Sequence, residues 1–426
     1  MPRGSIWGLY TYCNAAGGEA SVLEAPIGTE LSSPKLQRRR YVLWLFGTGV
    51  TVAGNALFNI AIGWQATGYG AQEAGIVLGV SSLVGSVFLL FGGALSDRLR
   101  PRQVMLVSTA IMFLVAIGAA IVGWFHALNP VWLVVFAVAL GLETAFYTPS
   151  SATMTRQLVS KQGFARALSL RQVVGQLASI GGRLVGGVIV TVGGLALASV
   201  MNAATYLVVF AVLLFLQVHL PRPQKRTVGA FQSIAEGLTF VARDRLLRSV
   251  VALTGAVAGF LLPLSTLLVP LVARERAMGS VGAGALLATI SGITMLVALV
   301  VSIRGASKHL GAWALAGVSL AAVGFSVLAV DGQISAFIGC AVAGLGQGLY
   351  IAHGAPLVRS VPYALMGRVQ STQALVQTAL LGLSTVFLGA FIAKTGVELG
   401  IALCAAVLGI SAIIGWCNRS LRKASL

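Results

Sequence analysis

Twelve long apolar runs, joined by short polar segments, make up most of this sequence. Each run is close to the roughly 20 residues that an α-helix needs to cross the hydrocarbon core of a bilayer. The runs are continuous and do not alternate between apolar and polar residues, as membrane-spanning strands would. They cover residues 41–66, 73–95, 103–125, 131–152, 168–192, 195–218, 249–272, 281–303, 312–330, 334–357, 369–392 and 397–417. The sequence therefore predicts an all-α integral membrane protein with twelve transmembrane helices.

The composition favours a membrane protein over the other classes of basic protein. Of 426 residues, 57% are hydrophobic and 9% are charged, and the mean hydropathy is +0.91, whereas soluble domains carry roughly 25% charged residues. The net charge of +18 comes mainly from short segments between the runs, so we expect no nucleic acid partner. The four cysteines lack the spacing of metal ligands, and we expect no metal and no cofactor.

The distribution of lysine and arginine predicts the orientation in the membrane. Of the 29 basic residues, 24 lie in the two termini and the even-numbered connections, whereas the opposite face carries only Arg274, Arg276 and Lys394. The remaining two, Arg171 and Arg183, lie inside the fifth run. Because cytoplasmic segments carry the excess of positive charge, we expect both termini in the cytoplasm and the protein in the plasma (inner) membrane.

Two segments without a long apolar run divide the chain. Residues 1–40 form a predicted cytoplasmic tail, and residues 219–248 form a cytoplasmic linker in which Phe231, Ile234 and Leu238 recur at the spacing of an amphipathic helix. The linker separates a six-helix bundle at 41–218 from a second at 249–418, and residues 419–426 form a short cytoplasmic tail.

The two predicted bundles carry a weak internal repeat. The stretch "GLETAFYTPSSATMTR" at 141–156 matches "GLGQGLYIAHGAPLVR" at 344–359, with glycine, tyrosine and arginine in register. Two similar halves of parallel topology imply a pseudo-two-fold axis along the membrane normal and a substrate site between the halves near mid-depth. This pseudo-symmetric arrangement is typical of a transporter.

The segment "GGALSDRLRPRQVM" at 92–105 resembles the signature that follows the second helix in the major facilitator superfamily. Arg100 and Pro101 depart from that signature, whereas Gly93, Leu95, Asp97, Arg98 and Arg102 match it. The stretches "FYTPSSATM", "RALSLRQVVGQLASIGG" and "AEGLTFVARDRLLRSV" are similar to the drug-exporter branch of macrolide efflux and enterobactin-export proteins.

The resemblance implies a conformational latch at the cytoplasmic face. A carboxylate beside several arginines can bind a cation on another helix, and such a contact must break when the two halves rock. The latch then comprises Gly93, Asp97, Arg98 and Arg102, with Arg156 as the partner on another helix. The alternative is that these arginines only follow the positive-inside rule.

Transport needs an energy source, and the chain has no glycine-rich phosphate loop. An ion gradient is therefore the default, and protons require a buried group that titrates. Glu143 is the only one of 11 acidic residues well within a predicted span, and His353 is a second candidate. For a lone intramembrane histidine, packing is the more common role.

Polar residues inside the spans predict the wall of a central cavity. The alternative for these residues is hydrogen bonding between helices, which polar side chains provide in any bundle. The candidates are Asn55, Asn59, Tyr147, Gln172, Gln176, Arg183, Gln347, Tyr350, Gln373 and Gln377.

Arg183 is the most costly of these candidates, because an arginine at mid-depth costs about 2.5 to 3.5 kcal/mol on insertion scales. We expect it to meet an anionic or electron-rich substrate group, or to pair with Glu143 in part of the cycle. A permanent structural pair and snorkelling to the interface are the alternatives. Gly182, Gly186 and Gly187 on the same run favour close helix packing.

The sequence therefore predicts a secondary active transporter, not an enzyme, that works as a monomer in the lipid bilayer. The preferred function is proton-coupled export of a medium-sized amphipathic compound, such as an antibiotic or a siderophore. Uptake or facilitated diffusion of a small metabolite is the alternative within transport. A membrane-embedded enzyme or lipid-handling protein is disfavoured, because four scattered histidines and one buried glutamate do not form a catalytic cluster.

We expect Asp97→Asn to leave the protein folded and inserted but to impair transport, because losing the carboxylate destabilises one of the two states. The check is transport by wild type and mutant at equal abundance in the membrane. Unchanged transport by the mutant would remove the latch assignment.

Overall fold

The computed structural model describes residues 34–98, 101–125, 128–159, 163–216, 239, 245–305, 307, 309–354 and 363–424. Every regular element in these ranges is a helix, in agreement with the predicted fold class. The elements are α1 (Pro34–Thr67), α2 (Ala71–Arg98), α3 (Pro101–Trp124), α4 (Pro130–Leu158), α5 (Phe164–Phe215), α7 (Arg245–Ala256), η1 (Val257–Leu261), η2 (Leu264–Leu268), α8 (Val269–Glu275), α9 (Gly279–Arg304), α10 (Leu310–Leu328), α11 (Gln333–Gly354), α12 (Tyr363–Thr395), α13 (Val397–Cys417) and α14 (Arg419–Arg422).

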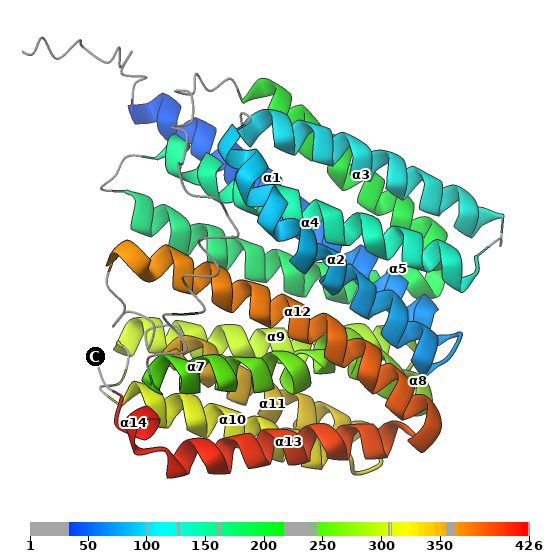
Figure 1. Ribbon diagram of the computed structural model, residues 1–426. Helices are drawn as coiled ribbons and strands as arrows, with labels where there is room; N and C mark the ends of the chain where they lie inside the picture. The colour runs from blue at the N-terminus through cyan, green and yellow to red at the C-terminus, as the bar shows by residue number, and fades with distance from the viewer. Residues whose placement is uncertain are drawn as a thin grey trace, which may run out of the picture.

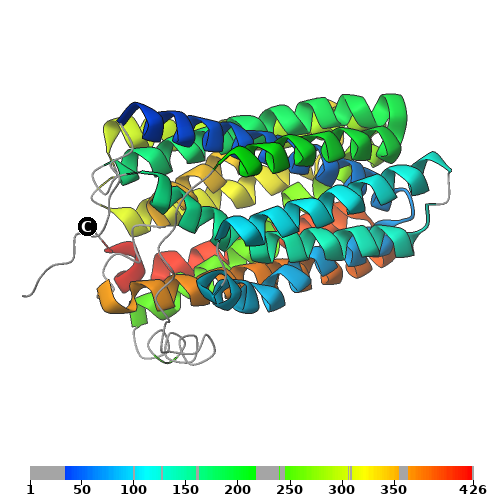
Figure 2. The same ribbon diagram turned by 90° about the horizontal axis from the view of Figure 1, so that it is seen from above.

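The helices run lengthwise side by side, with short turns at one end and both ends of the described chain at the other (Figures 1 and 2). We call these the turn end and the terminus end. Helices α1 to α5 occupy one side of the molecule and α7 to α14 the other (Figure 1). Within the described ranges, 11 helical stretches are long and apolar enough to cross a membrane.

Helix α5 contains two of the predicted spans in one element of 52 residues. At about 1.5 Å per residue it would extend about 78 Å if straight, far beyond the hydrocarbon thickness of about 30 Å. Gly193 and Gly194 interrupt it with non-helical backbone, and Gly194 has φ 57° and ψ −151°. Glycine tolerates this conformation because it has no Cβ.

The predicted N-terminal tail and most of the predicted linker lie outside the described residues. Helix α1 begins at Pro34, earlier than the predicted run, and α7 begins at Arg245, inside the predicted linker. The amphipathic helix predicted around Phe231, Ile234 and Leu238 falls on residues that are not described.

The seventh predicted span contains two π-helical turns. Helix α7 continues through η1 and η2 into α8, with Pro263 between the π turns and Pro270 in the first turn of α8. Proline lacks the N–H that an α-helix needs at interior positions, and wider turns accommodate the missing bond. The span is therefore locally irregular although its residues are mostly buried.

Glycines allow the two sides of the molecule to approach closely near the turn end. A Cβ on Gly75 of α2 would lie 2.7 Å from the Cα of Gly389 and 2.9 Å from the carbonyl oxygen of Thr385 on α12. A Cβ on Gly187 of α5 would lie 2.7 Å from the carbonyl oxygen of Ser280 on α9. We call these two contacts the α2–α12 seam and the α5–α9 seam.

An arginine adds a polar contact across the same end. The guanidinium of Arg274 on α8 lies 4.4 Å from the ring centroid of Trp64 on α1. It donates to the carbonyl oxygen of Trp64 at 2.7 Å and to Oγ1 of Thr67 at 3.2 Å. Together with the seams, this contact holds the two sides of the molecule together near the turn end.

We expect Gly75→Ala to weaken closure of the turn end, because the added methyl group overlaps the backbone of α12. Overpacking of this kind costs about 1 to 3 kcal/mol, which lowers the ratio of closed to open molecules roughly fivefold or more. Spin labels at Gln72→Cys and Lys394→Cys, in a background without native cysteines, report the distance between α2 and α12. Gly118→Ala is the control, since its Cβ meets nothing within 4 Å. An unchanged distance distribution in Gly75→Ala would contradict the role of the seam.

Candidate substrate and proton site

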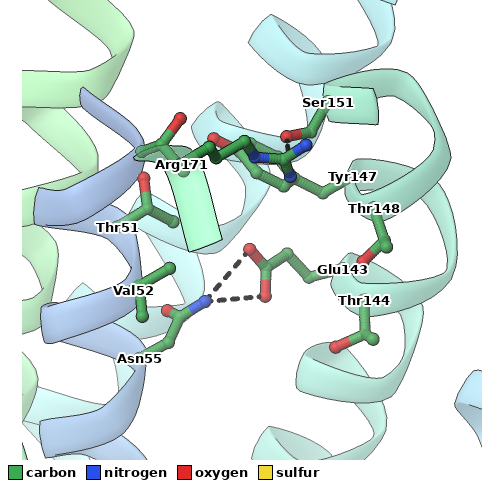
Figure 3. Close-up of a pocket in the computed structure, with 10 residues that line it drawn as sticks. Thr51, Val52, Asn55, Glu143, Thr144, Tyr147, Thr148, Ser151 and Arg171 are labelled. Atoms are coloured by element: carbon green, nitrogen blue, oxygen red, sulfur yellow. Dashed lines mark hydrogen bonds between the residues drawn. The ribbon is translucent and has the colours of Figure 1, made fainter. Parts of the chain in front are cut away.

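A cavity of about 170 Å³ lies among α1, α4 and α5 and contains the buried carboxylate of Glu143. Most of the side chains around it are polar (Figure 3). Its lining residues are Thr48, Thr51, Val52, Asn55, Glu143, Thr144, Tyr147, Thr148, Ser151 and Arg171.

Helix α4 supplies half of this lining through its helical spacing. Glu143, Thr144, Tyr147, Thr148 and Ser151 follow at intervals of one, three, one and three residues, which keeps them on one face. The stretch "GLETAFYTPSS" therefore places one carboxylate and several hydroxyl groups toward α1 and α5. This pattern is readable in the sequence, although only Glu143 and Tyr147 were singled out from it.

Glu143 is held by neutral groups. Its side chain is 6% exposed, and Asn55 Nδ2 donates to both carboxylate oxygens, at 3.3 and 3.2 Å (Figure 3). The hydroxyl of Tyr206 donates to Asn55 Oδ1 at 2.7 Å, which fixes the orientation of the amide. Asn59 donates to the backbone oxygen of Asn55 at 2.7 Å and so supports the same turn. The carboxylate can gain or lose a proton without breaking an ion pair within the described part of the chain.

Arg171 is the one lining residue of functional interest that sequence reasoning passed over. Its guanidinium donates to Ser151 Oγ at 2.8 Å and to Thr155 Oγ1 at 3.4 Å. Trp44 Nε1 also donates to Thr155 Oγ1, at 3.3 Å. A second arginine inside the fifth run was the available signal, because a cation within a span is normally functional or paired.

The hydroxyl oxygen of Tyr147 is buried beside this arginine. It makes no hydrogen bond of ordinary geometry to any described residue. A buried hydroxyl without a partner costs free energy that a bound molecule can recover. The cavity thus offers a buried hydroxyl group that a bound molecule can satisfy.

Arg183 lies at the α5–α9 seam. It donates to the carbonyl oxygen of Leu287 at 3.3 Å and also bonds to Ser291 Oγ. The backbone oxygen of Arg183 in turn faces Gly284, where a Cβ would lie 2.6 Å away. The arginine therefore contacts α9, whereas Glu143 contacts α1. The two side chains do not pair in this conformation.

Two further predicted residues form a polar cluster on the other side of the molecule. The hydroxyls of Tyr350 and Thr254 lie 2.8 Å apart, and Gln373 Nε2 donates to Thr254 Oγ1 at 3.2 Å. Helices α7, α11 and α12 supply them, and none of the three lines the cavity at Glu143. Within the internal repeat, Tyr350 of this cluster occupies the position that matches Tyr147 of the cavity.

The remaining candidates lie elsewhere. His353 is buried, its Nδ1 lies 3.1 Å from the carbonyl oxygen of Leu349, and its ring stacks on Trp313 at 5.8 Å. These contacts are those of a packed side chain. Four predicted glutamines do not line the cavity. Gln172 is exposed, and Gln176, Gln347 and Gln377 are half-buried.

Most of the predicted latch cannot be placed, because the side chains of Asp97, Arg98 and Arg156 and the surroundings of Gly93 are not among those that the structure describes. Arg102 is described, and it donates to the carbonyl oxygens of Leu213 and Leu214 at 2.8 and 3.0 Å. These oxygens belong to the last turn of α5, where a cation is favourable. Within the described ranges, no three histidine, cysteine or acidic side chains are grouped to hold a metal ion.

Comparison with known proteins gives a consistent result. The sequence matches the family model for the Major Facilitator Superfamily over residues 44–385. It is similar to the multidrug efflux pump Tap of Mycobacterium tuberculosis, with 29% identity over 245 residues, covering 54% of this chain and 57% of Tap. It is also similar to the enterobactin exporter EntS of Shigella dysenteriae, with 24% identity over 225 residues, covering 52% of this chain and 46% of EntS. The chain spans about half the length of these curated relatives.

Solved structures with the same fold are more distant in sequence. The nucleoside transporter NupG matches with a TM-score of 0.73 and 11% identity, covering 89% of this chain and 98% of NupG. A bacterial homologue of the human lysosomal transporter Spinster matches with a TM-score of 0.71 and 13% identity, covering 92% of this chain and 98% of that protein. At these identities the likeness concerns the fold alone.

We expect Arg183→Gln to favour the closed α5–α9 seam, because glutamine can still donate to α9 but no longer buries an unpaired charge. Removing that burial should shift the population toward closure by about 1 kcal/mol, or roughly fivefold. Spin labels at Val192→Cys and Val281→Cys follow the seam. Arg183→Lys is the matched control, since it keeps the charge. A seam that opens more often in Arg183→Gln would show that the arginine instead holds the helices together.

Proposed function

The chain belongs to the major facilitator superfamily, and on this premise we propose that it is a proton-coupled exporter of a medium-sized amphipathic organic compound. The substrate class is that of antibiotics and siderophores. Membership itself makes the chain a multi-pass membrane transporter with a small-molecule substrate. The single observation that carries the proposal of proton coupling is the buried carboxylate of Glu143 in a polar cavity.

We infer that the chain crosses the membrane twelve times in two six-helix bundles, at 41–218 and 249–418. The support is the break at Gly193–Gly194, which divides the overlong helix α5 into two segments that each fit a bilayer. The excess of basic residues at the terminus end supports a cytoplasmic location for both termini and for the linker at 219–248. With that orientation the turn end faces outward and is the closed end.

Alternating access then follows from the seams. Opening toward the outside requires α2 to part from α12 and α5 to part from α9, together with release of Arg274 from Trp64 and Thr67. Glycine-lined contacts can separate without stranding large side chains, so the two halves can rock as units. The cytoplasmic latch of Gly93, Asp97, Arg98, Arg102 and Arg156 remains our proposal for holding the opposite end in the other state.

Export is the preferred direction because both curated relatives are named for it, Tap as a multidrug efflux pump and EntS as an exporter. The fold does not decide the direction, since the solved neighbours include a nucleoside transporter. The inward flow of protons can drive export if the proton and the substrate bind alternately at the carboxylate of Glu143. Asn55 supports this role, because its amide can orient the carboxyl group in either protonation state.

We expect Glu143→Gln to abolish accumulation against a gradient while still permitting exchange of substrate across the membrane. Glutamine is close to glutamic acid in shape but has no proton to deliver. The measurement is the cellular accumulation of a panel of antibiotics and siderophores, with and without an ionophore that collapses the proton gradient. Glu398→Gln is the control, because Glu398 is exposed in the first turn of α13. Normal proton-driven transport by Glu143→Gln would contradict the coupling role. Higher accumulation in cells with the wild-type protein than in cells without it would show uptake instead of export.

A further inference from the structure

The cavity at Glu143 contains two opposite charges that are not paired with each other. Glu143 bonds to Asn55, and Arg171 bonds to Ser151 and Thr155. Figure 3 shows the guanidinium and the carboxylate reaching the same space from α5 and α4. Within the described ranges, neither charge has an ion-pair partner. The cavity is therefore close to neutral as a whole but has a negative and a positive pole.

Each pole is oriented from behind by neutral groups. The Tyr206 hydroxyl fixes the Asn55 amide that holds Glu143, at 2.7 Å. Ser151 and Thr155 hold the guanidinium of Arg171 against α4, at 2.8 and 3.4 Å. Both charges are thus kept in position while their remaining bonding capacity stays free. Such preorganisation lowers the cost of binding a complementary ligand.

Burial makes this arrangement costly unless a ligand completes it. A charge withdrawn from water is unfavourable when it lacks an opposite charge. Glu143 is buried and Arg171 is half-buried, and each has only neutral partners among the described residues. A ligand with a single charge would compensate one pole and leave the other. A ligand with both charges compensates the two poles at once, and the buried hydroxyl of Tyr147 can form one more hydrogen bond with it.

The size of the cavity restricts the ligand further. About 170 Å³ is well below the roughly 300 to 1,000 Å³ of pockets that enclose drug-sized molecules. The cavity can therefore enclose only a head group, in which the positive and the negative group are a few bonds apart. The rest of an amphipathic molecule would lie outside the cavity.

We propose that this cavity is a subsite for a compact zwitterion, with a primary amine at Glu143 and a carboxylate at Arg171. The inference rests on the proposed transport function and names its substrate class as amphipathic compounds with an amino-acid-like head. Because the amine and the proton then compete for Glu143, binding of one displaces the other, as exchange requires. The planar guanidinium can receive the carboxylate through two parallel hydrogen bonds.

The test is equilibrium binding to the purified full chain in lipid nanodiscs, which does not depend on direction or on a proton gradient. The probes are 3-(2-naphthyl)alanine, its methyl ester and its N-acetyl derivative. These share one aromatic tail and present a zwitterion, a cation and an anion. We expect the zwitterion to bind about tenfold to a hundredfold more tightly than either derivative, in line with charge-assisted hydrogen bonds.

The variants assign the two poles separately. In Arg171→Gln the amino acid should no longer bind more tightly than its methyl ester, but it should still bind more tightly than its N-acetyl derivative. In Glu143→Gln the amino acid should still bind more tightly than its methyl ester, but no longer more tightly than its N-acetyl derivative. Arg166→Gln is the matched control on the same helix, because Arg166 is exposed and outside the cavity. If Arg171→Gln does not fold, Arg171→Lys serves instead. It should reduce the preference for acid, since an ammonium cannot form the two parallel bonds.

Three outcomes would overturn the subsite. They are equal binding of the zwitterion and either derivative, equal weakening of all three probes in Arg171→Gln, and no binding of any probe to wild type. Equal weakening would show that Arg171 stabilises the fold. A failure here leaves proton-driven export intact, because export is measured in cells with unrelated compounds. Conversely, zwitterion binding without proton-driven export would contradict only the proposed function.

Discussion

A bilayer offers no water to a backbone N–H or C=O group, and most features of this structure follow from that constraint. Every backbone polar group inside the hydrocarbon region has to bond within the protein, which the helix achieves locally. The described chain accordingly consists of long helices with short turns. Where the chain departs from regular geometry inside a span, as in η1 and η2, the residues are mostly buried against other helices.

The same constraint makes close helix contacts depend on small residues. Lipid tails are as apolar as leucine, so burial of apolar surface gives helices in a bilayer little reason to associate. Glycines on α2 and α12, and on α5 and α9, let the backbones meet and gain dispersion contacts instead. These contacts are concentrated near the turn end. A structure built in this way can separate at one end without exposing large side chains.

Charges inside the spans are the exceptions, and three of them lie at internal contacts of the protein. Glu143 and Arg171 line the cavity, and Arg183 lies at a seam between the two sides of the molecule. All three bond to neutral amides, hydroxyls or carbonyl oxygens, which orient them without cancelling their charge. Placing a charge inside a span costs free energy that a neutral residue would not require, and this is the physical reason to regard these positions as functional.

The sequence alone determined the all-helical fold class and the presence of many long apolar helices, because insertion depends on the length and hydropathy of each local stretch. It also singled out Glu143, Asn55, Tyr147 and Arg183 as unusual residues within spans. It did not predict their contacts in this conformation, in which Arg183 bonds to α9 and Arg171, rather than Arg183, lines the cavity with Glu143. Such contacts join residues far apart in the chain: Asn55 and Glu143 are separated by 88 positions, and Arg183 and Leu287 by 104. These contacts depend on the rotation of each helix about its own axis. That rotation is set by how the helix packs against all its neighbours, so it is known only from the tertiary structure.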